Sequence, residues 1–319
     1  MRPIPVAFHL WFLEIHTYGI GLALTFWFGL RYTERRLGRA GYDNSWVTSL
    51  FLWVIGAAIV GARALHVVSN LGYYSTHPAQ IIAIWQGGLS SFGGLIFAVP
   101  VAIVIQRRRC PDLSTLRFAD LMAPILMACW SLGRILGPQL MVAGGGHATN
   151  QWFGMYYAGQ VGKRLPVPIF QSLEDLAIFI VLILVGRHLE KVGPLLRPEL
   201  ADDPKALAKL PRPPAGLILG IGMVMWGIER FLDEHLWLGE DGKVGSMLVQ
   251  IAGLTLAAVG LVLLVSRWRA LPAWRAAVKD ADVDDSTEAG GLDVDEEADV
   301  ALTGEVARSA DSPRNDGSA

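Results

Sequence analysis

The sequence predicts an all-α, polytopic integral membrane protein with about seven transmembrane helices, a small external head loop and a disordered cytoplasmic tail. Of the 319 residues, 52% are hydrophobic and only 18% are charged, and the mean hydropathy is +0.40. Apolar stretches of about 20 residues, the length that crosses a bilayer core of roughly 30 Å, also recur along almost the whole chain. This composition therefore requires the membrane as its solvent.

Seven apolar stretches have about the length of a transmembrane helix. They lie at Leu13–Leu30, Trp46–Val68, Leu89–Ile105, Phe118–Leu136, Phe170–Gly186, Pro214–Leu232 and Ser246–Val265. The first is no cleavable signal peptide, because its basic cluster follows the apolar residues instead of preceding them. The second and fourth each contain an arginine, the third follows a glycine-rich segment, the fifth begins and the sixth ends with charged residues, and the seventh carries no charge.

The distribution of Lys and Arg predicts the orientation of these helices, because basic loops are retained in the cytoplasm. Eighteen Lys and Arg lie in the loops and ends on one side, whereas the other side has four, which are Arg2, Lys163, Arg164 and Lys243. We therefore expect the N-terminus outside and the C-terminus in the cytoplasm.

The organisation expected from this orientation is a membrane domain over residues 1–270, with an external head at residues 138–169. After Trp274 the composition changes, and Asp280 to Ala319 contains thirteen Asp and Glu but no aromatic residue. Such a segment cannot bury enough apolar surface to order itself. Residues 271–319 are therefore predicted to be a disordered acidic cytoplasmic tail.

Charge and cysteine content exclude several classes of function. The formal net charge of −2 excludes a basic nucleic-acid-binding protein. The only two cysteines, Cys110 and Cys129, are too few for a disulfide framework or a zinc site. We expect no metal and no cofactor.

Charged residues within the apolar stretches gather in the outer half of the membrane in this orientation. Three of them are arginines on three different predicted helices, Arg63, Arg134 and Arg230. Snorkelling to the interface, or salt bridges to Glu234 and Asp175, would explain one such residue. Three together favour a pocket for an anionic phospholipid headgroup, because the planar guanidinium matches phosphate bidentately.

A glycine-rich segment begins the third predicted helix. Gly93 and Gly94 follow Phe92 there, and a second glycine pair precedes them. Paired glycines often serve close packing of membrane helices. Alternatively, the exposed amides of a broken turn bind phosphate oxygens.

Five motifs, in this order, resemble those of the prolipoprotein diacylglyceryl transferases. They are His16–Gly19, Gly61–His66, Trp85–Leu95, Asp120–Pro124 followed by Gly133 and Arg134, and Trp226–Arg230 followed by Glu234. The resemblance covers roughly residues 14 to 265. The chain departs from the family pattern at several positions. Phe92 stands where the family usually has His and Trp226 where it has Tyr, and further departures follow Arg134 and begin the fifth stretch.

The resemblance implies a seven-helix enzyme of the bacterial inner membrane that moves diacylglyceryl from phosphatidylglycerol, a membrane lipid, to the lipobox cysteine of a prolipoprotein. Arg134 and Arg230 would neutralise the departing phosphate. Because Phe92 cannot accept a proton, His147 of the external loop is the candidate general base, although a solvated loop histidine is equally compatible with its position. The remaining substrate-binding candidates are Tyr18, Arg63, Gly93, Gly94, Gly133 and Glu234.

Two other classes of function remain open. A catalytically diverged relative would keep the lipid pocket and act as a non-enzymatic phospholipid-binding membrane protein. A transporter would need polar groups at the midplane and on the inner side as well, and these are missing.

Overall fold

The computed structural model describes residues 6–10, 13–83, 90–137, 140, 144–157, 160–192, 212–238 and 244–280. Within these ranges, seven helices of 17 to 26 residues form the body of the molecule and overlap the seven predicted stretches. They are α1 (Thr17–Arg39), α2 (Val47–Ser69), α4 (Ser91–Arg109), α5 (Thr115–Leu136), α6 (Val167–Val192), α8 (Leu217–Asp233) and α9 (Val244–Trp268).

The membrane character of the fold is confirmed by these helices. Among the described residues, four helical segments are long and apolar enough to cross a bilayer, which are Val47–Ser69, Thr115–Leu136, Val167–Leu189 and Val249–Asp280. Their exposed surfaces are rich in large apolar side chains such as Trp53, Leu184 and Val262. The full number of seven spans stays a prediction.

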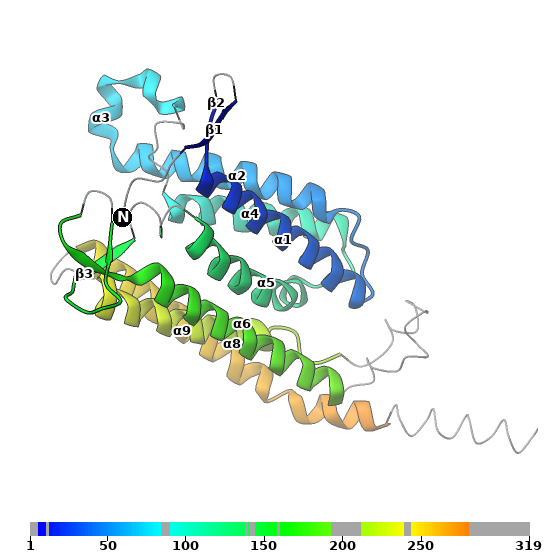
Figure 1. Cartoon of the computed structure of the whole chain (residues 1–319). Helices are drawn as coiled ribbons and strands as arrows, with labels where there is room; N and C mark the ends of the chain where they lie inside the picture. Colours follow the sequence, from blue (N-terminus) through cyan, green and yellow to red (C-terminus); the bar gives the residue numbers. More distant parts are fainter. Residues whose placement is uncertain are drawn as a thin grey trace, which may run out of the picture.

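The helices pack in pairs around α5 (Figure 1). Helix α2 pairs with α4, α8 pairs with α9, and α5 lies against both α1 and α6. Backbones approach closely at two of these contacts because glycines face each other. A Cβ on Gly93 would lie 2.2 Å from the carbonyl oxygen of Gly61, and one on Gly227 would lie 2.5 Å from that of Gly253.

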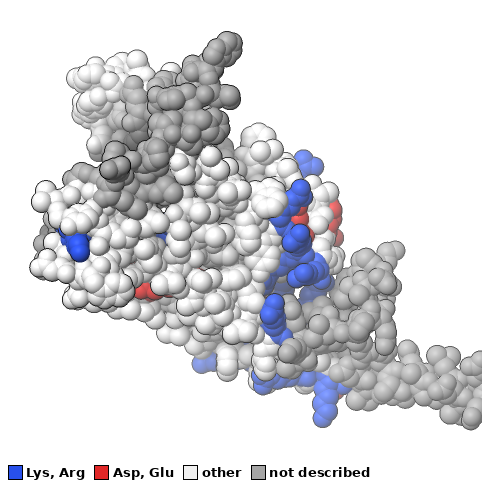
Figure 2. All heavy atoms as spheres, in the orientation of Figure 1, with Lys and Arg blue, Asp and Glu red and all other residues white. Residues whose placement is uncertain are grey.

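Basic side chains gather at one end of the helices (Figure 2). This end, which we call the basic end, includes the last turns of α1, with Arg36 and Arg39, and of α4, with Arg107, Arg108 and Arg109. The opposite end, which we call the head end, carries the strand β3 (Gly145–Ala148) (Figure 1). The concentration of Lys and Arg at one end agrees with the distribution of these residues in the sequence. The side of the membrane on which each end lies stays a prediction.

The start of α8 is held at the basic end by a carboxylate from α5. Asp120, which is 4% exposed, accepts hydrogen bonds from the backbone amides of Gly216 (2.6 Å) and Leu219 (2.8 Å). The first amides of a helix have no partner within the helix, so Asp120 acts as an N-cap supplied by another helix. Arg117 adds a hydrogen bond to the carbonyl of Pro213. These contacts fix the position of α8 relative to α5.

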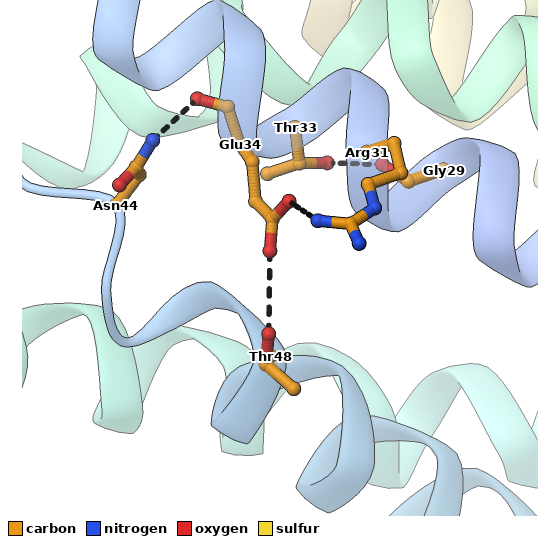
Figure 3. Close-up of polar contacts among 6 residues, drawn as sticks. All are labelled: Gly29, Arg31, Thr33, Glu34, Asn44 and Thr48. Atoms are coloured by element: carbon orange, nitrogen blue, oxygen red, sulfur yellow. Dashed lines mark hydrogen bonds and ion pairs between the residues drawn. The ribbon is translucent and has the colours of Figure 1, made fainter.

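Glu34 joins α1 to α2 at the same end (Figure 3). Its carboxylate forms an ion pair with Arg31 at 2.9 Å and accepts a hydrogen bond from Thr48 of α2 at 3.2 Å. The Asn44 side chain donates to the Glu34 carbonyl at 3.0 Å (Figure 3). The short loop between the two helices is therefore tied to both.

Two small sheets were not foreseen from the sequence. Strands β1 (Val6–Leu10) and β2 (Leu13–His16) form an antiparallel hairpin, and the order in the second sheet is β3-β5-β4, with β4 at Met155–Tyr156 and β5 at Lys163–Pro166. The prediction that the first helix begins at Leu13 is therefore wrong, since α1 begins at Thr17. Glu14 and His16 belong to β2.

The predicted boundary of the disordered tail is also wrong. Residues 271–280 are helical, and Leu271, Trp274 and Val278 are 4 to 6% exposed. Their spacing of three and four residues places them on one face of the helix, which packs into the core formed with α5, α6 and α8. Residues 281–319, the rest of the predicted tail, lie outside the described residues.

Candidate functional site

Six ionisable side chains from three helices meet at the head end. They are Arg134 from the last turn of α5, Glu174 and Asp175 from the start of α6, and Glu229, Arg230 and Asp233 from the last turns of α8. Asp175, Asp233 and Glu229 are 0%, 1% and 7% exposed, respectively. We call this group the charged cluster. Because burying charged groups is costly, such a cluster within a membrane domain is a candidate site.

Helices α5 and α6 are joined one turn away from the cluster by two serines. The Ser131 hydroxyl donates to the Ser172 carbonyl at 2.8 Å, and the Ser172 hydroxyl donates to the Ser131 carbonyl at 3.0 Å. Arg134 lies three residues after Ser131 on α5, and Asp175 lies three residues after Ser172 on α6. Each charged residue therefore lies on the same face of its helix as the serine. The serine pair thus brings these two charged residues to the same level.

Asp233 links α8 to α6 and holds Arg230. One oxygen of its carboxylate accepts a hydrogen bond from Gln171 of α6 at 2.8 Å and forms an ion pair with Arg230 at 3.1 Å. Arg230 and Asp233 are three residues apart, so they lie on one side of α8. A buried charge-assisted hydrogen bond of this kind fixes the direction of the guanidinium group.

Arg134 lies within the electrostatic field of the rest of the cluster. The charges that act on it are those of Arg230, Asp175, Asp233 and Glu229. Two guanidinium groups from different helices therefore share one small region, which the carboxylates make tolerable in the free protein. The N–H groups of both guanidinium groups are donors whose hydrogen bonds a phosphate oxygen could accept.

The surroundings of the charged cluster include a pair of tryptophan rings and free space at Gly133. The rings of Trp130 and Trp226 pack edge to face with centroids 5.3 Å apart. A Cβ added to Gly133 would meet no described atom within 4 Å. The cluster therefore has an apolar neighbour suited to lipid and free space one residue before Arg134.

Arg63 lies elsewhere at the head end. It is 7% exposed and donates hydrogen bonds to the backbone carbonyls of Ile81, at 2.8 Å, and Gln80, while its guanidinium stands 5.3 Å from the centroid of the Tyr74 ring. These contacts hold the segment formed by α3 (Leu71–Thr76) and the 3-10 helix η1 (Pro78–Ile82) against α2.

The other predicted substrate-binding residues are dispersed. Gly93 of α4 is packed against Gly61 of α2, so the close-packing interpretation describes its surroundings. Gly94 is buried beside Ala58, which also belongs to α2. Glu234 begins the π-helix η6 (Glu234–Leu238) and is half-buried. The alternative explanation of Arg230 was a salt bridge to Glu234, but the structure shows the ion pair with Asp233, whose carboxylate also accepts a hydrogen bond from Gln171 of α6.

His147 is exposed in strand β3. A Cβ on the preceding Gly146 would lie 2.2 Å from the Trp237 carbonyl oxygen, so this strand rests on η6, which directly follows Asp233. His147 therefore lies in a strand that packs on η6, and it is not part of the charged cluster. The side chains of Tyr18 and Phe92 lie outside the described residues.

The fold and this cluster define a helical integral membrane protein with a buried charged site at the head end. A family model for prolipoprotein diacylglyceryl transferase matches residues 5–266, which include every residue of the cluster. The chain belongs to this family. Membership makes the protein a membrane-bound transferase.

Curated relatives agree with the family match. The chain is similar to the phosphatidylglycerol–prolipoprotein diacylglyceryl transferases of Bacillus licheniformis and Bacillus velezensis, with 34% and 33% identity. These matches cover 60% and 57% of this chain and 73% and 70% of the relatives. A protein of the same description from Finegoldia magna is 26% identical over 82% of this chain and 94% of the relative.

Proposed function

We propose that this protein transfers a diacylglyceryl group from phosphatidylglycerol to the lipobox cysteine thiol of a prolipoprotein. The observation that carries the proposal is the meeting of Arg134 and Arg230 in one buried cluster, in a chain that matches the family over residues 5–266. Both guanidinium groups are partly buried, and they come from different helices.

The reaction explains why two guanidinium groups are needed. The thiolate sulfur forms a bond to the glyceryl carbon of the lipid, and the bond from that carbon to the phosphate oxygen breaks. Glycerol phosphate leaves with the electron pair, so negative charge increases on the phosphate during the reaction. Arg134 and Arg230 stabilise this charge with bidentate hydrogen bonds in a region of low dielectric constant.

The cysteine thiol must lose its proton before it attacks, because the thiolate is the nucleophile. We assign this step to His147, which lies in the strand that covers η6. Its imidazole ring can accept a proton near neutral pH. Phe92, which stands where the family has a histidine, has no group that can do so.

The remaining residues are assigned to substrate binding. Arg63 supports the segment of α3 and η1 at the head end, where a lipid headgroup would enter. Tyr18 positions the headgroup through its hydroxyl, and Gly133 leaves room beside Arg134. Further contacts are assigned to Gly93, Gly94 and Glu234.

The orientation follows from the basic end of the molecule. With the basic end in the cytoplasm, the charged cluster opens to the outer leaflet of the bacterial inner membrane, the N-terminus is outside and the C-terminus inside. The lipid and the prolipoprotein then meet on the outer side.

The test is incubation of the purified full-length protein in detergent with phosphatidylglycerol and a lipobox peptide, followed by mass spectrometry. A diacylglyceryl adduct on the peptide cysteine is the expected result, and a peptide with Ser in place of that Cys is the control. Absence of the adduct together with retained binding of phosphatidylglycerol would replace the transferase by a non-enzymatic lipid-binding protein. The replacements at Phe92 and Trp226 favour that second candidate.

A further inference from the structure

A groove lies on the surface of helices α2 and α4 near the basic end. Its volume is about 440 Å³, which falls within the usual range of about 300–1,000 Å³ for ligand sites. Most of its wall is apolar and comes from side chains such as Trp53 of α2 and Val101 and Val104 of α4. Trp53 and Val104 are 65% and 47% exposed, so the groove opens on the lipid-facing surface of the helices.

The polar residues of the groove lie at the basic end. Arg108 and Arg109 line it in the last turn of α4. Gly61 of α2 meets Gly93 at the start of α4, whereas Ser49, at the start of α2, lines the groove beside the end of α4. The two helices are therefore antiparallel, and the groove becomes apolar from the basic end toward the middle of the helices.

The two arginines of the groove have no protein carboxylate to neutralise them. Neither Arg108 nor Arg109 forms an ion pair or a hydrogen bond with the residues that the structure describes, whereas Arg107 donates to Thr115 Oγ1 at 3.0 Å. The stretch 107–112 contains three arginines and one aspartate. Their positive charge attracts anions, and the planar guanidinium fork matches two oxygens of a phosphate.

The length of the groove matches the depth of one leaflet. At about 1.5 Å per residue, α4 spans about 14 Å from Pro100 to Arg109. The hydrocarbon core of one leaflet is about 15 Å thick, which is half of the roughly 30 Å of a bilayer. An acyl chain in the apolar part of the groove therefore places its headgroup phosphate at the level of the arginines.

We propose that this groove binds one anionic glycerophospholipid of the leaflet at the basic end. An acyl chain lies against Trp53 and Val104, and the headgroup phosphate contacts Arg108 and Arg109. A zwitterionic headgroup brings a cation of its own beside the two arginines, so charge selects the anionic lipid. Basic pockets between membrane helices on the cytoplasmic side commonly bind anionic headgroups.

This lipid is distinct from the proposed substrate lipid. The groove lies at the basic end, whereas the charged cluster lies at the head end. In the proposed orientation the groove faces the inner leaflet and the transfer site faces the outer leaflet. The lipid of the groove is therefore a ligand that holds α2 and α4 together, and its binding does not depend on the transfer reaction.

The experiment uses full-length protein in phosphatidylcholine vesicles that contain a small fraction of phosphatidylglycerol with a photoactivatable diazirine in one acyl chain. After irradiation, mass spectrometry of peptides should find the label on residues 49–53 and 100–105. Excess unlabelled phosphatidylglycerol should remove this label, and excess phosphatidylethanolamine should not. Label spread evenly over the lipid-facing helices, or equal competition by both lipids, would overturn the proposal, because the protein would then hold only unspecific boundary lipid.

A first pair of variants tests the charge. Arg108→Gln combined with Arg109→Gln should lower labelling of the groove by about tenfold, since each basic residue near the membrane surface contributes to binding of anionic lipid. Arg35→Gln combined with Arg39→Gln removes two exposed positive charges from α1 at the same end and should leave the labelling unchanged. An equal loss in both double variants would overturn the proposal in favour of a general attraction to the basic end.

A second pair tests the groove and keeps all the arginines in place. Val104→Trp fills the groove with an exposed side chain, so the fold is kept and labelling should fall. Val99→Trp, at a valine of the same helix that is 52% exposed and does not line the groove, is the control. Unchanged labelling in Val104→Trp, or loss of this label in Arg230→Lys at the head end, would overturn the proposal. A negative transfer assay has no bearing on these outcomes.

Discussion

Arg230 is held by the helix to which it belongs. Asp233, one turn further along α8, forms the ion pair with it and shares the same oxygen with Gln171 of α6. The guanidinium group therefore has one side fixed by a buried carboxylate. The remaining donors of its planar fork can be used for a ligand, since an arginine has five N–H groups.

The first prediction separates a phosphate site from a helix anchor. Arg134→Lys or Arg230→Lys keeps the charge but loses the bidentate geometry, so binding of phosphatidylglycerol should fall by about tenfold, equivalent to about 1.4 kcal/mol. Thermal unfolding with and without added lipid measures this, because only a ligand of the native state raises its stability. Arg35→Lys, on the exposed surface at the basic end, is the control and should change nothing. Equal protection by phosphatidylglycerol and a zwitterionic lipid would contradict the assignment.

The arginines of the site could be predicted from the sequence, whereas their partners could not. An arginine within an apolar stretch is visible in the sequence because it costs several kcal/mol there. The choice between Asp233 and Glu234 as the partner of Arg230 depends on which side of α8 faces α6. That direction is set by packing between helices and has no local signal.

At the level of elements, the contact between α5 and α8 is made at both ends of the helices. The charged cluster joins them at the head end, and Asp120 binds the first amides of α8 at the basic end. Helix α8 is therefore held in position along its length.

The second prediction concerns this cap. Asp120→Ala leaves the amides of Gly216 and Leu219 without their acceptor, so the free energy of unfolding should fall by about 2 kcal/mol. The melting temperature of the detergent-solubilised protein measures the effect. Asp112→Ala, an exposed carboxylate in the loop between α4 and α5, is the matched control. A similar melting temperature for both variants would show that the cap does not stabilise α8.

The third prediction tests the new boundary of the tail. Truncation after Asp280 should leave the melting temperature unchanged. Truncation after Ala270 should lower it strongly, because it removes the buried Leu271, Trp274 and Val278, and loss of one buried Trp side chain alone costs about 3–5 kcal/mol. Equal stability of the two truncated proteins would show that residues 271–280 contribute nothing to the core.

The long helices could be predicted because length and apolarity are sufficient signals for them. The sheet β3-β5-β4 could not, since its strands have two to four residues and contain glycine and charged residues. The helix at 271–280 was missed because it is short, and its three buried apolar residues, Leu271, Trp274 and Val278, do not form an apolar stretch of transmembrane length.

For the whole molecule, the opposite ends of the helices define a charge axis. Basic residues gather at one end (Figure 2). The charged cluster lies at the other end, near the last turns of α5 and α8. If the basic end faces the cytoplasm, every part of the proposed site lies on the outer side.

The fourth prediction tests this orientation. A membrane-impermeant maleimide added outside intact cells should label His147→Cys and spare Asn315→Cys. Background labelling should be low, because Cys110 is 6% exposed and burial raises the pKa of its thiol, which lowers the thiolate fraction at neutral pH. The reverse labelling pattern would overturn the topology and, with it, the outer-leaflet site.

The glycine contact between α8 and α9 limits which substitutions α9 can accept. Helix α9 carries none of the cluster residues, yet Gly253 and Gly260 lie against the backbone of α8, and a Cβ at Gly260 would lie 2.6 Å from the Cβ of Met223. Any larger residue at either position pushes α8 away and moves Glu229, Arg230 and Asp233 together. Helix α9 thus has two positions, seven residues apart, at which a single added methyl group would disturb the placement of the charged cluster. Its remaining lipid-facing positions can exchange one apolar side chain for another.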